Sequence, residues 1–272
     1  MAPTSFAAIG HVTNDHLAAG IVPGGSALYA TLTAAGLGLS ARAVTSHGPD
    51  FRGGALFAAA GVSVENDAAA RTTTFENVYL HAARRARVLA VASPLARPAE
   101  ADIILACPVI DEVAPSALRG RLVGAGLQGW FRRLGPGGVV ERRVPDDLGF
   151  LAPCRAVFVS VEDLGDDAPR VLPKLRAIVP IVVVTDGARG ATIHADRVHE
   201  IGVHPADEVD PTGAGDVFAT AFLVALARGD DLEAAGAFGA AAASIVVEGV
   251  GPAALSRLGE TAERYTRMRG SR

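Results

Sequence analysis

The feature that most restricts the fold is an alternation of short apolar runs with longer segments rich in Ala and Leu. Ser5–Ile9 is followed by Ser26–Gly36, and Arg42–Thr45 is followed by Phe51–Ala60. The short runs suit buried strands, whereas the longer segments have helical length. The alternation continues through Ile103–Ala106 with Ala114–Leu118, Leu122–Ala125, Ala156–Val159 with Pro169–Ala177, and Ile181–Thr185. This order predicts an α/β fold with a central, mostly parallel sheet and helices on both faces.

The last third of the chain changes character. Gly215–Arg228 and Leu232–Val247 have the length and the Ala-rich composition of two long helices. Gly229 follows the first and Gly249 follows the second, and glycine commonly terminates helices. We therefore predict a helical region after the alternating part.

Two segments have β character outside the alternation. Thr72–Leu80 and Ala86–Ala92 are strand-like and predict a hairpin with a loop over residues 81–85, and His16–Pro23 predicts a much shorter hairpin centred on residues 18–20. Such insertions in an α/β domain suggest a small, reduced β lid, formed by residues 11–23 and 72–92. No repeat or linker divides the chain, so residues 1–272 are predicted to form a single domain.

The composition excludes several functional classes. The chain has 272 residues, 50% of them hydrophobic, and a formal net charge of -4. A mildly acidic globular chain lacks the basic surface that sequence-independent nucleic-acid binding requires. Cys107 and Cys154 lie far apart in apolar surroundings, the first residues carry no basic leader, and the apolar runs are broken well before bilayer length. We predict a cytoplasmic protein without a membrane segment.

The only lysine is Lys174, in the helical-looking stretch 173–179. The P-loop requires a lysine directly after its glycines, and the protein-kinase fold requires one on a strand. Neither context surrounds Lys174, so these two routes to nucleotide chemistry are excluded.

The strongest chemical motif is Asp210-Pro211-Thr212-Gly213-Ala214-Gly215-Asp216, which runs directly into a predicted helix. Successive small residues let backbone N–H groups point into one concavity at a helix N-terminus, where an anion is favoured. Asp216 would lie beside that anion and could accept a proton from an attacking hydroxyl. The alternative is an acidic cap on a helix that follows a glycine turn.

Residues 210–216 match the motif D-[TP]-T-G-A-G-D, so the chain resembles the ribokinase-like, or PfkB-type, carbohydrate and nucleoside kinases. Pro23-Gly24-Gly25-Ser26-Ala27 is similar to the family's GG segment, and Gly48, Asp50 and Gly53 fit its G-x-D-x-x-G turn. The resemblance implies a ribokinase-like fold and ATP-dependent phosphorylation of a sugar, polyol or nucleoside hydroxyl. It assigns Asp216 as the base and the amides of Gly213, Ala214 and Gly215 as the holders of the charge on the transferred group.

The resemblance also implies an acceptor site. Asp15 matches the family's substrate-binding aspartate, and Tyr29 stands where many relatives have asparagine. An aromatic residue there resembles the myo-inositol-kinase-like branch, although Tyr29 also fits a core position on an apolar helix. The residues assigned to the acceptor are Asp15, Gly24, Gly25, Tyr29, Gln128, Arg132 and Asp210.

The donor site implied by the resemblance follows two strands. Thr185-Asp186-Gly187-Ala188-Arg189-Gly190 resembles the T-x-G-x-x-G nucleotide loop, which assigns Thr185, Gly187 and Gly190 to the nucleotide. Ser160-Val161-Glu162-Asp163 stands where the family has N-x-x-E, so Ser replaces Asn and Asp replaces Glu. Ser160 is assigned to the nucleotide, and Asp163 and Glu162 to Mg²⁺. The resemblance leaves open a monovalent-cation requirement and a homodimer formed through the lid.

Two other functions are weighed. Gly124-Ala125-Gly126-Leu127-Gln128-Gly129 has the spacing of a dinucleotide-binding motif, but the helix this motif requires is cut off at residues 135–138. An NAD-dependent oxidoreductase is therefore disfavoured. A non-catalytic sensor that binds nucleotide or polyol is motivated by the altered segment 160–163, whereas the retention of Asp216 argues against it.

Overall fold

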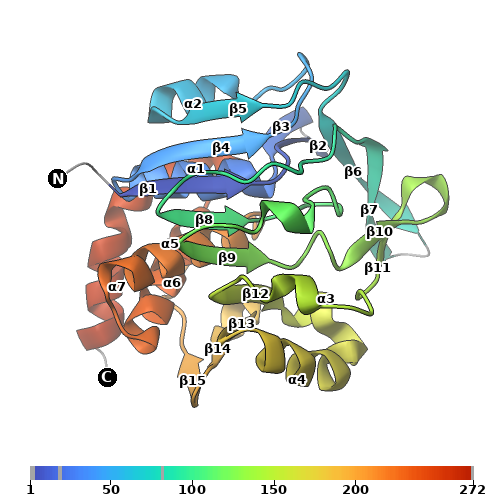
Figure 1. Ribbon diagram of the computed structural model, residues 1–272. Coiled ribbons are helices and arrows are strands. Elements are labelled where there is room, and N and C mark those ends of the chain that lie inside the picture. Colours follow the sequence, from blue (N-terminus) through green and yellow to red (C-terminus); the bar gives the residue numbers. More distant parts are fainter. Residues whose placement is uncertain (1–3, 18–19, 81–82, 271–272) are drawn as a thin grey trace.

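A nine-stranded sheet forms the centre of the computed structural model, which describes residues 4–17, 20–80 and 83–270 (Figure 1). Its strand order is β15-β14-β13-β12-β9-β8-β1-β4-β5. Every pairing from β5 to β13 is parallel, and the two pairings at the other edge, β13 with β14 and β14 with β15, are antiparallel. The strand bounds are β1 Ser5–Ile9, β4 Ser40–Thr45, β5 Ser63–Asn66, β8 Ile103–Ala106, β9 Leu122–Gly126, β12 Ala156–Ser160, β13 Ile181–Thr185, β14 Ala191–His194 and β15 Val198–Ile201. The predicted α/β class is confirmed.

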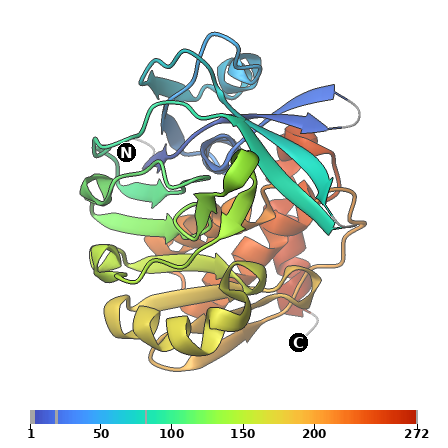
Figure 2. The same cartoon turned by 90° about the vertical axis from the view of Figure 1, so that its right-hand side faces the viewer.

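Helices cover both faces of this sheet, as its two-sided apolar strands require. Along β1, Phe6 and Ala8 pack into one core, whereas Ala7 and Ile9 pack into the other. The first core lies under α1 (Ser26–Gly36), α2 (Gly54–Ala60), α5 (Ala214–Arg228) and α6 (Leu232–Val246), and the second lies under α4 (Ala168–Ile178). The 3₁₀ segment η6 (Gly251–Glu260) and α7 (Thr261–Gly270) pack on α6. Figure 2 shows α4 on the opposite side of the lower strands from these C-terminal helices.

Several predicted helix ranges differ from those of the structure. Residues 114–118 form only the 3₁₀ turn η1 (Pro115–Ala117), next to a strand-like connection in which the Ala114 N–H donates to the Leu95 carbonyl. Helix α4 is one residue longer at each end than predicted, and α5 begins one residue earlier. Helix α2 begins at Gly54 rather than at Phe51, whose N–H closes the preceding turn onto Gly48. Helix α6 ends at Val246, before Val247, whose carbonyl accepts hydrogen bonds from another segment. Residues 114 and 247 thus make contacts distant in sequence, whereas the start of α2 is displaced by a local turn.

The predicted β insertions form a second sheet of four strands in the order β3-β2-β6-β7, seen at the right of Figure 1. Its strands are β2 (Thr13–Leu17), β3 (Gly20–Gly24), β6 (Thr73–Leu80) and β7 (Ala83–Ala90). The longer hairpin has a shorter loop than predicted, because β7 already begins at Ala83. Two of the three residues predicted to centre the shorter hairpin, 18 and 19, lie outside the described residues, and the third, Gly20, begins β3. This sheet is the predicted lid, and its closure stays a prediction.

The dinucleotide-like segment does not lead into a helix. After β9 the chain makes a turn and enters a small hairpin of β10 (Arg132–Leu134) and β11 (Val140–Arg142). Without a helix N-terminus after the glycines, this segment has no place for a pyrophosphate group in the dinucleotide manner. The structure therefore agrees with setting the NAD interpretation aside.

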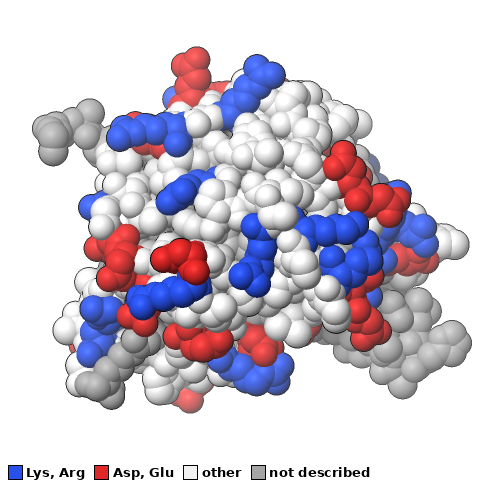
Figure 3. Space-filling view, turned by 60° about the horizontal axis from the view of Figure 1, so that its bottom comes forward, with Lys and Arg blue, Asp and Glu red and all other residues white. Residues whose placement is uncertain are grey.

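Two further observations concern the surface charge and the length of the apolar helices. Acidic and basic side chains are interspersed over the face displayed in Figure 3. Within the described part of the chain, no helix combines the length and the apolar character needed to cross a bilayer.

Candidate active site

The loop before α5 forms the turn that the sequence motif predicted. Gly213 has φ +81°, a conformation that glycine adopts without strain, and α5 begins at the next residue. A Cβ atom on Gly213 would lie 2.3 Å from Cδ1 of Tyr29, whereas one on Gly215 would meet nothing within 4 Å. The turn is thus closed on the Tyr29 side and open at Gly215. The Ala214 N–H, predicted to face the anion, donates instead to the Pro211 carbonyl at 3.2 Å, so the N–H groups of Gly215 and Asp216 are the better placed to face a ligand.

Asp210 braces this turn with both carboxylate oxygens. Its Oδ1 accepts hydrogen bonds from the Thr212 N–H at 3.0 Å and the Thr212 hydroxyl at 2.6 Å. Its Oδ2 accepts from the Gly251 N–H at 2.9 Å, which ties the turn to the start of η6. Asp210 was predicted as an acceptor ligand, and the geometry gives it a role in holding the turn.

Asp216 lies in the first turn of α5, where the start of α1 approaches it. It is partly buried and accepts a hydrogen bond from the Ser26 side chain. Burial raises the pKa of Asp216 to about 7, against the lowering effects of the Ser26 hydrogen bond and the Arg132 charge; Asp163 raises it further. A carboxylate with a pKa near neutrality is well matched to accept a proton from a hydroxyl.

Arg132 is the cation that faces this carboxylate. It is partly buried at the start of β10, and its charge interacts with those of Asp163, Asp216 and Glu112. Burial lowers the pKa of its guanidinium, but an arginine side chain stays charged in proteins. Gln128, predicted alongside it, is exposed in the turn after β9. Arg132 is therefore the better placed of the two to neutralise an anion beside Asp216.

Two of the residues predicted to bind the acceptor, Asp15 and Gly24, lie on β2 and β3. Asp15 accepts a hydrogen bond from the Thr13 hydroxyl at 2.8 Å, and its pKa is raised to about 6, mainly by burial and further by the charge of Asp210. A Cβ on Gly24 would lie 2.3 Å from Oδ2 of Asp15, and one on Gly25, where φ is +90°, would lie 2.5 Å from the His11 carbonyl oxygen. Both glycines are thus required by close packing around Asp15.

Tyr29 has the core position that one of the two interpretations of the sequence expects, and its contact with an acceptor stays a prediction. It is only 2% exposed and belongs to the core under α1. Its ring also packs against Gly213, and the charges of Asp15, Asp210 and Asp216 raise the pKa of its phenol beyond the effect of burial. The buried Tyr29 ring therefore lies between the predicted acceptor residue Asp15 and the turn at residues 210–216, which is called the anion turn below.

The predicted donor residues follow adjacent strands. Ser160 at the end of β12 is the register partner of Thr185 at the end of β13. Gly187 and Gly190 lie in the β13–β14 connection, where a Cβ on Gly190 would meet the Ile201 carbonyl oxygen at 2.1 Å. The carboxyl ends of parallel strands are where α/β proteins bind ligands, so this edge suits a donor.

The segment that departs from the family pattern forms a compact cap. Ser160 begins α3 (Val161–Leu164), accepts from the Asp163 N–H at 2.9 Å and donates its hydroxyl to Asp163 Oδ2 at 2.7 Å. Asp163 also interacts with the charges of Arg132 and Asp216, whereas Glu162 is exposed on α3. The structure thus brings Asp163 to the site and leaves Glu162 at its periphery.

The side chains available to ligate Mg²⁺ fit the ion only if substrate phosphates supply further ligands. Among the described residues no group of three or more His, Cys, Asp or Glu side chains is placed to hold a metal. Mg²⁺ commonly uses one or two carboxylates plus phosphates and waters, so Asp163 at the edge of the site is compatible with it.

Two groups escaped the sequence analysis. Ser26 was seen only as part of the GG segment, yet its side chain bonds Asp216. Glu112 is 4% exposed, and its carboxylate accepts hydrogen bonds from the backbone N–H groups of His11, Val109 and Ile110, which fixes the loop after β8 beside Arg132. The pair Asp111-Glu112 within an apolar stretch was the available signal for Glu112, whereas nothing local marks Ser26.

Comparisons with known proteins point to the part of the chain that carries the anion turn. Residues 159–257 match the model of the pfkB family carbohydrate kinases. A nucleoside kinase of Methanothermobacter thermautotrophicus is 41% identical over 98 residues, which are 35% of this chain and 32% of that protein. The match thus spans about a third of the relative's length.

Solved structures extend the likeness to nearly the whole fold. A pyrophosphate-dependent kinase in the ribokinase family, complexed with a pyrophosphate analog and myo-inositol, has a TM-score of 0.81 at 22% identity and covers 95% of this chain and 99% of its own. The nucleoside kinase of Methanocaldococcus jannaschii has a TM-score of 0.75 at 18% identity and covers 98% and 100%. At these identities the likeness establishes the ribokinase fold, which confirms the fold expected from the resemblance.

The two raised carboxyl pKa values predict a pH dependence for any activity at this site. A base must be deprotonated to act, so kcat/KM should rise with pH through about 7, the pKa of Asp216, and fall more steeply below about 6, where Asp15 also becomes protonated. Initial rates at subsaturating acceptor over a pH series measure this. The Asp15→Asn variant should lose the steeper lower limb, and a flat wild-type profile would contradict both assignments.

Proposed function

We propose that this protein is a kinase that transfers a phosphoryl group to a hydroxyl of a small sugar, polyol or nucleoside. The observation that carries the proposal is Asp216, a carboxyl group with a pKa near 7 placed beside an open helix N-terminus and an arginine. A carboxylate next to an anion site is repelled by the anion, so its presence is best explained by a role as base. The pfkB match and the nucleoside kinase relative support this class of reaction.

In the proposed reaction, Asp216 accepts the proton of the acceptor hydroxyl as its oxygen attacks the terminal phosphorus of the donor. The amides of Gly213, Gly215 and Asp216 and the guanidinium of Arg132 stabilise the charge on the transferred group. Asp15 holds a second acceptor hydroxyl, and the wall formed by Tyr29 fixes the ring of the acceptor. Mg²⁺, when bound with the donor near Asp163, neutralises phosphate charge.

We propose Mg-ATP as the donor, in line with the nucleotide-like loop at Thr185–Gly190. One observation favours a second candidate: the solved structures with a TM-score of 0.81 are described as pyrophosphate-dependent. Both donors present the same phosphoryl group to the anion turn and differ only in the leaving group. The choice of donor therefore depends on which leaving group the connections after Ser160 and Thr185 can bind.

A panel assay tests the proposal. Polyols, sugars and nucleosides are offered with Mg-ATP and, separately, with Mg-pyrophosphate, and acceptor-dependent release of ADP or phosphate is measured. Turnover with at least one pair is expected. Tight calorimetric binding of donor and acceptor without turnover under any pair would favour the non-catalytic sensor instead. A cytoplasmic location, a single domain, a monovalent-cation requirement and a homodimer through the lid stay predictions.

Tyr29 gives a test of the acceptor side. Tyr29→Phe keeps the ring against Gly213 and removes only the hydroxyl, so stability should change by less than about 1.5 kcal/mol. We expect the ranking of acceptors by kcat/KM to change while the donor KM stays constant. Tyr29→Asn, which also removes the ring, should add a loss of thermal stability. If both variants keep the wild-type ranking of acceptors, Tyr29 is a core residue only.

A further inference from the structure

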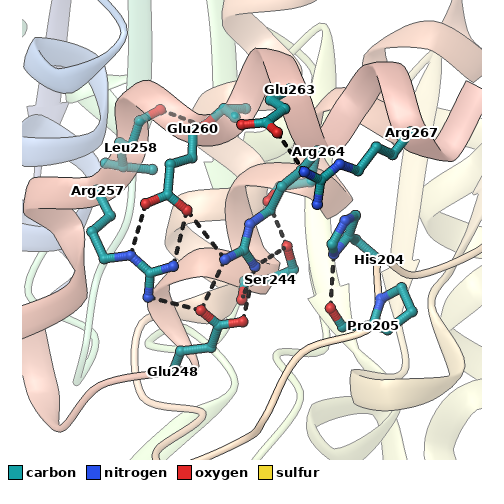
Figure 4. A network of polar contacts seen from close by, with 12 residues as sticks. His204, Pro205, Ser244, Glu248, Arg257, Leu258, Glu260, Glu263, Arg264 and Arg267 are labelled. Atoms are coloured by element: carbon teal, nitrogen blue, oxygen red, sulfur yellow. Dashed lines mark hydrogen bonds and ion pairs between the residues drawn. The ribbon is translucent and has the colours of Figure 1, made fainter.

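A network of ion pairs centred on the buried side chain of Arg264 lies between the C-terminal helix and the end of α6 (Figure 4). Arg264 on α7 is 7% exposed, and its two terminal nitrogens donate to the two oxygens of Glu248, Nη1 to Oε1 at 3.0 Å and Nη2 to Oε2 at 2.8 Å. Nη1 also donates to the Ser244 carbonyl oxygen at 3.0 Å. Arg257 adds a bond from its Nη1 to Glu248 Oε2 at 2.8 Å. Glu248 is thus held from two sides.

The segment that carries Glu248 also holds the anion turn. The Val247 carbonyl accepts hydrogen bonds from the N–H groups of Val209 at 2.7 Å and Asp210 at 3.1 Å. Two residues beyond Gly249, the Gly251 N–H donates to Asp210 Oδ2 at 2.9 Å. Residues 247–251 therefore contact the motif on both sides of Glu248, and they have no regular helix to fix them, because α6 ends at Val246.

Loss of the arginine would leave Glu248, whose side chain is 19% exposed, without its bidentate partner. Arg257, an exposed side chain, would then be its remaining ion-pair partner and would contact only one of its two oxygens. A poorly solvated carboxylate with half of its compensation removed is costly, so the side chain would turn toward water and shift its own backbone. That backbone holds Asp210, which in turn fixes Thr212 ahead of Gly213. A small displacement of catalytic groups is known to cost large factors in rate.

We propose that Arg264 is a positioning residue for the turn Asp210–Asp216, acting through Glu248 and residues 247–251. The C-terminal helix α7 then contributes to phosphoryl transfer although it carries none of the residues assigned to the site. The part of this inference that concerns turnover rests on the proposed function. The part that concerns the position of the turn does not.

The test compares Arg264→Gln with two controls. Arg267→Gln removes an exposed arginine of the same helix that pairs with Glu263, and Val171→Ala removes core volume under α4, on the other face of the sheet. Hydrogen exchange of the Val209, Asp210 and Gly251 amides is measured together with kcat and both KM values. In Arg264→Gln these amides should exchange faster and kcat should fall by about tenfold or more, with smaller changes in KM. Arg264→Lys should recover part of the loss.

Each outcome decides the inference. Wild-type exchange and kcat in Arg264→Gln, or a loss no larger than that of Val171→Ala at matched thermal stability, would overturn it. Should Arg264→Gln fail to fold, Glu248→Gln, which keeps the shape and removes the charge, is measured in its place with the same expectation. If the wild type itself phosphorylates no acceptor, the proposed function fails, and the exchange rates alone decide whether Arg264 positions the turn.

Discussion

Replacing Asp216 with Asn is expected to lower kcat by about a hundredfold or more while the fold and donor binding persist. Asn is nearly the same size and can still accept the hydrogen bond from Ser26, but it cannot take the proton of the acceptor hydroxyl. Donor affinity should stay equal or increase, because a negative charge beside the phosphates is removed. Acceptor-dependent product release and calorimetric donor binding, measured on one folded preparation, give both quantities.

A matched control distinguishes a catalytic role of Asp216 from a structural one. Asp231 begins α6 and its Oδ1 accepts from the Ala234 N–H at 2.8 Å, so Asp231→Asn makes the same chemical change at a helix start outside the site. It should leave turnover within about twofold, since Asn caps helices as well as Asp. The N-cap of α5 is Gly213, so the capping role that the sequence left open for Asp216 is not seen. Equal, small losses in Asp216→Asn and Asp231→Asn would mean that Asp216 has only a structural role, through its hydrogen bond with Ser26.

Gly213→Ala is the second change with a large expected effect. The new methyl group would overlap the Tyr29 ring, and the positive φ would add a strain of about 1–2 kcal/mol. The turn must open or Tyr29 must move, and either response displaces the amides that face the transferred group. We expect kcat to fall by about a hundredfold and the unfolding temperature to decrease. Thermal unfolding and turnover with a saturating acceptor measure both.

The other end of the same helix supplies the control. Gly229 follows α5 with φ +95°, and a Cβ there would meet nothing within 4 Å. Gly229→Ala therefore introduces comparable backbone strain without the clash, so it should lower stability and leave kcat unchanged. If the two variants lose kcat to the same degree after correction for stability, the close approach of Gly213 and Tyr29 has no catalytic importance.

The local sequence was sufficient for the elements whose signals are local. The strands β1, β8 and β13 have the predicted bounds, because each is an apolar run whose neighbours cannot extend it. The anion turn was also predictable, since only glycine adopts the backbone of Gly213 easily and small residues free the amides after it. By contrast, the helix expected at residues 114–118 did not form: one 3₁₀ turn is present, and the chain just before it pairs with the segment at Leu95, a contact that no local pattern indicates.

The sequence by itself determined the α/β class, the extra β sheet, the turn at residues 210–216 and the identity of the acid that follows it. Only the tertiary structure decided the environment of that acid. The hydrogen bond from Ser26 and the charges of Arg132 and Asp163 come from other parts of the chain, and together with burial they set the pKa of Asp216. Backbone conformation depends mainly on adjacent residues, whereas solvation and charge depend on whatever the fold brings within a few ångströms, and no local pattern encodes that.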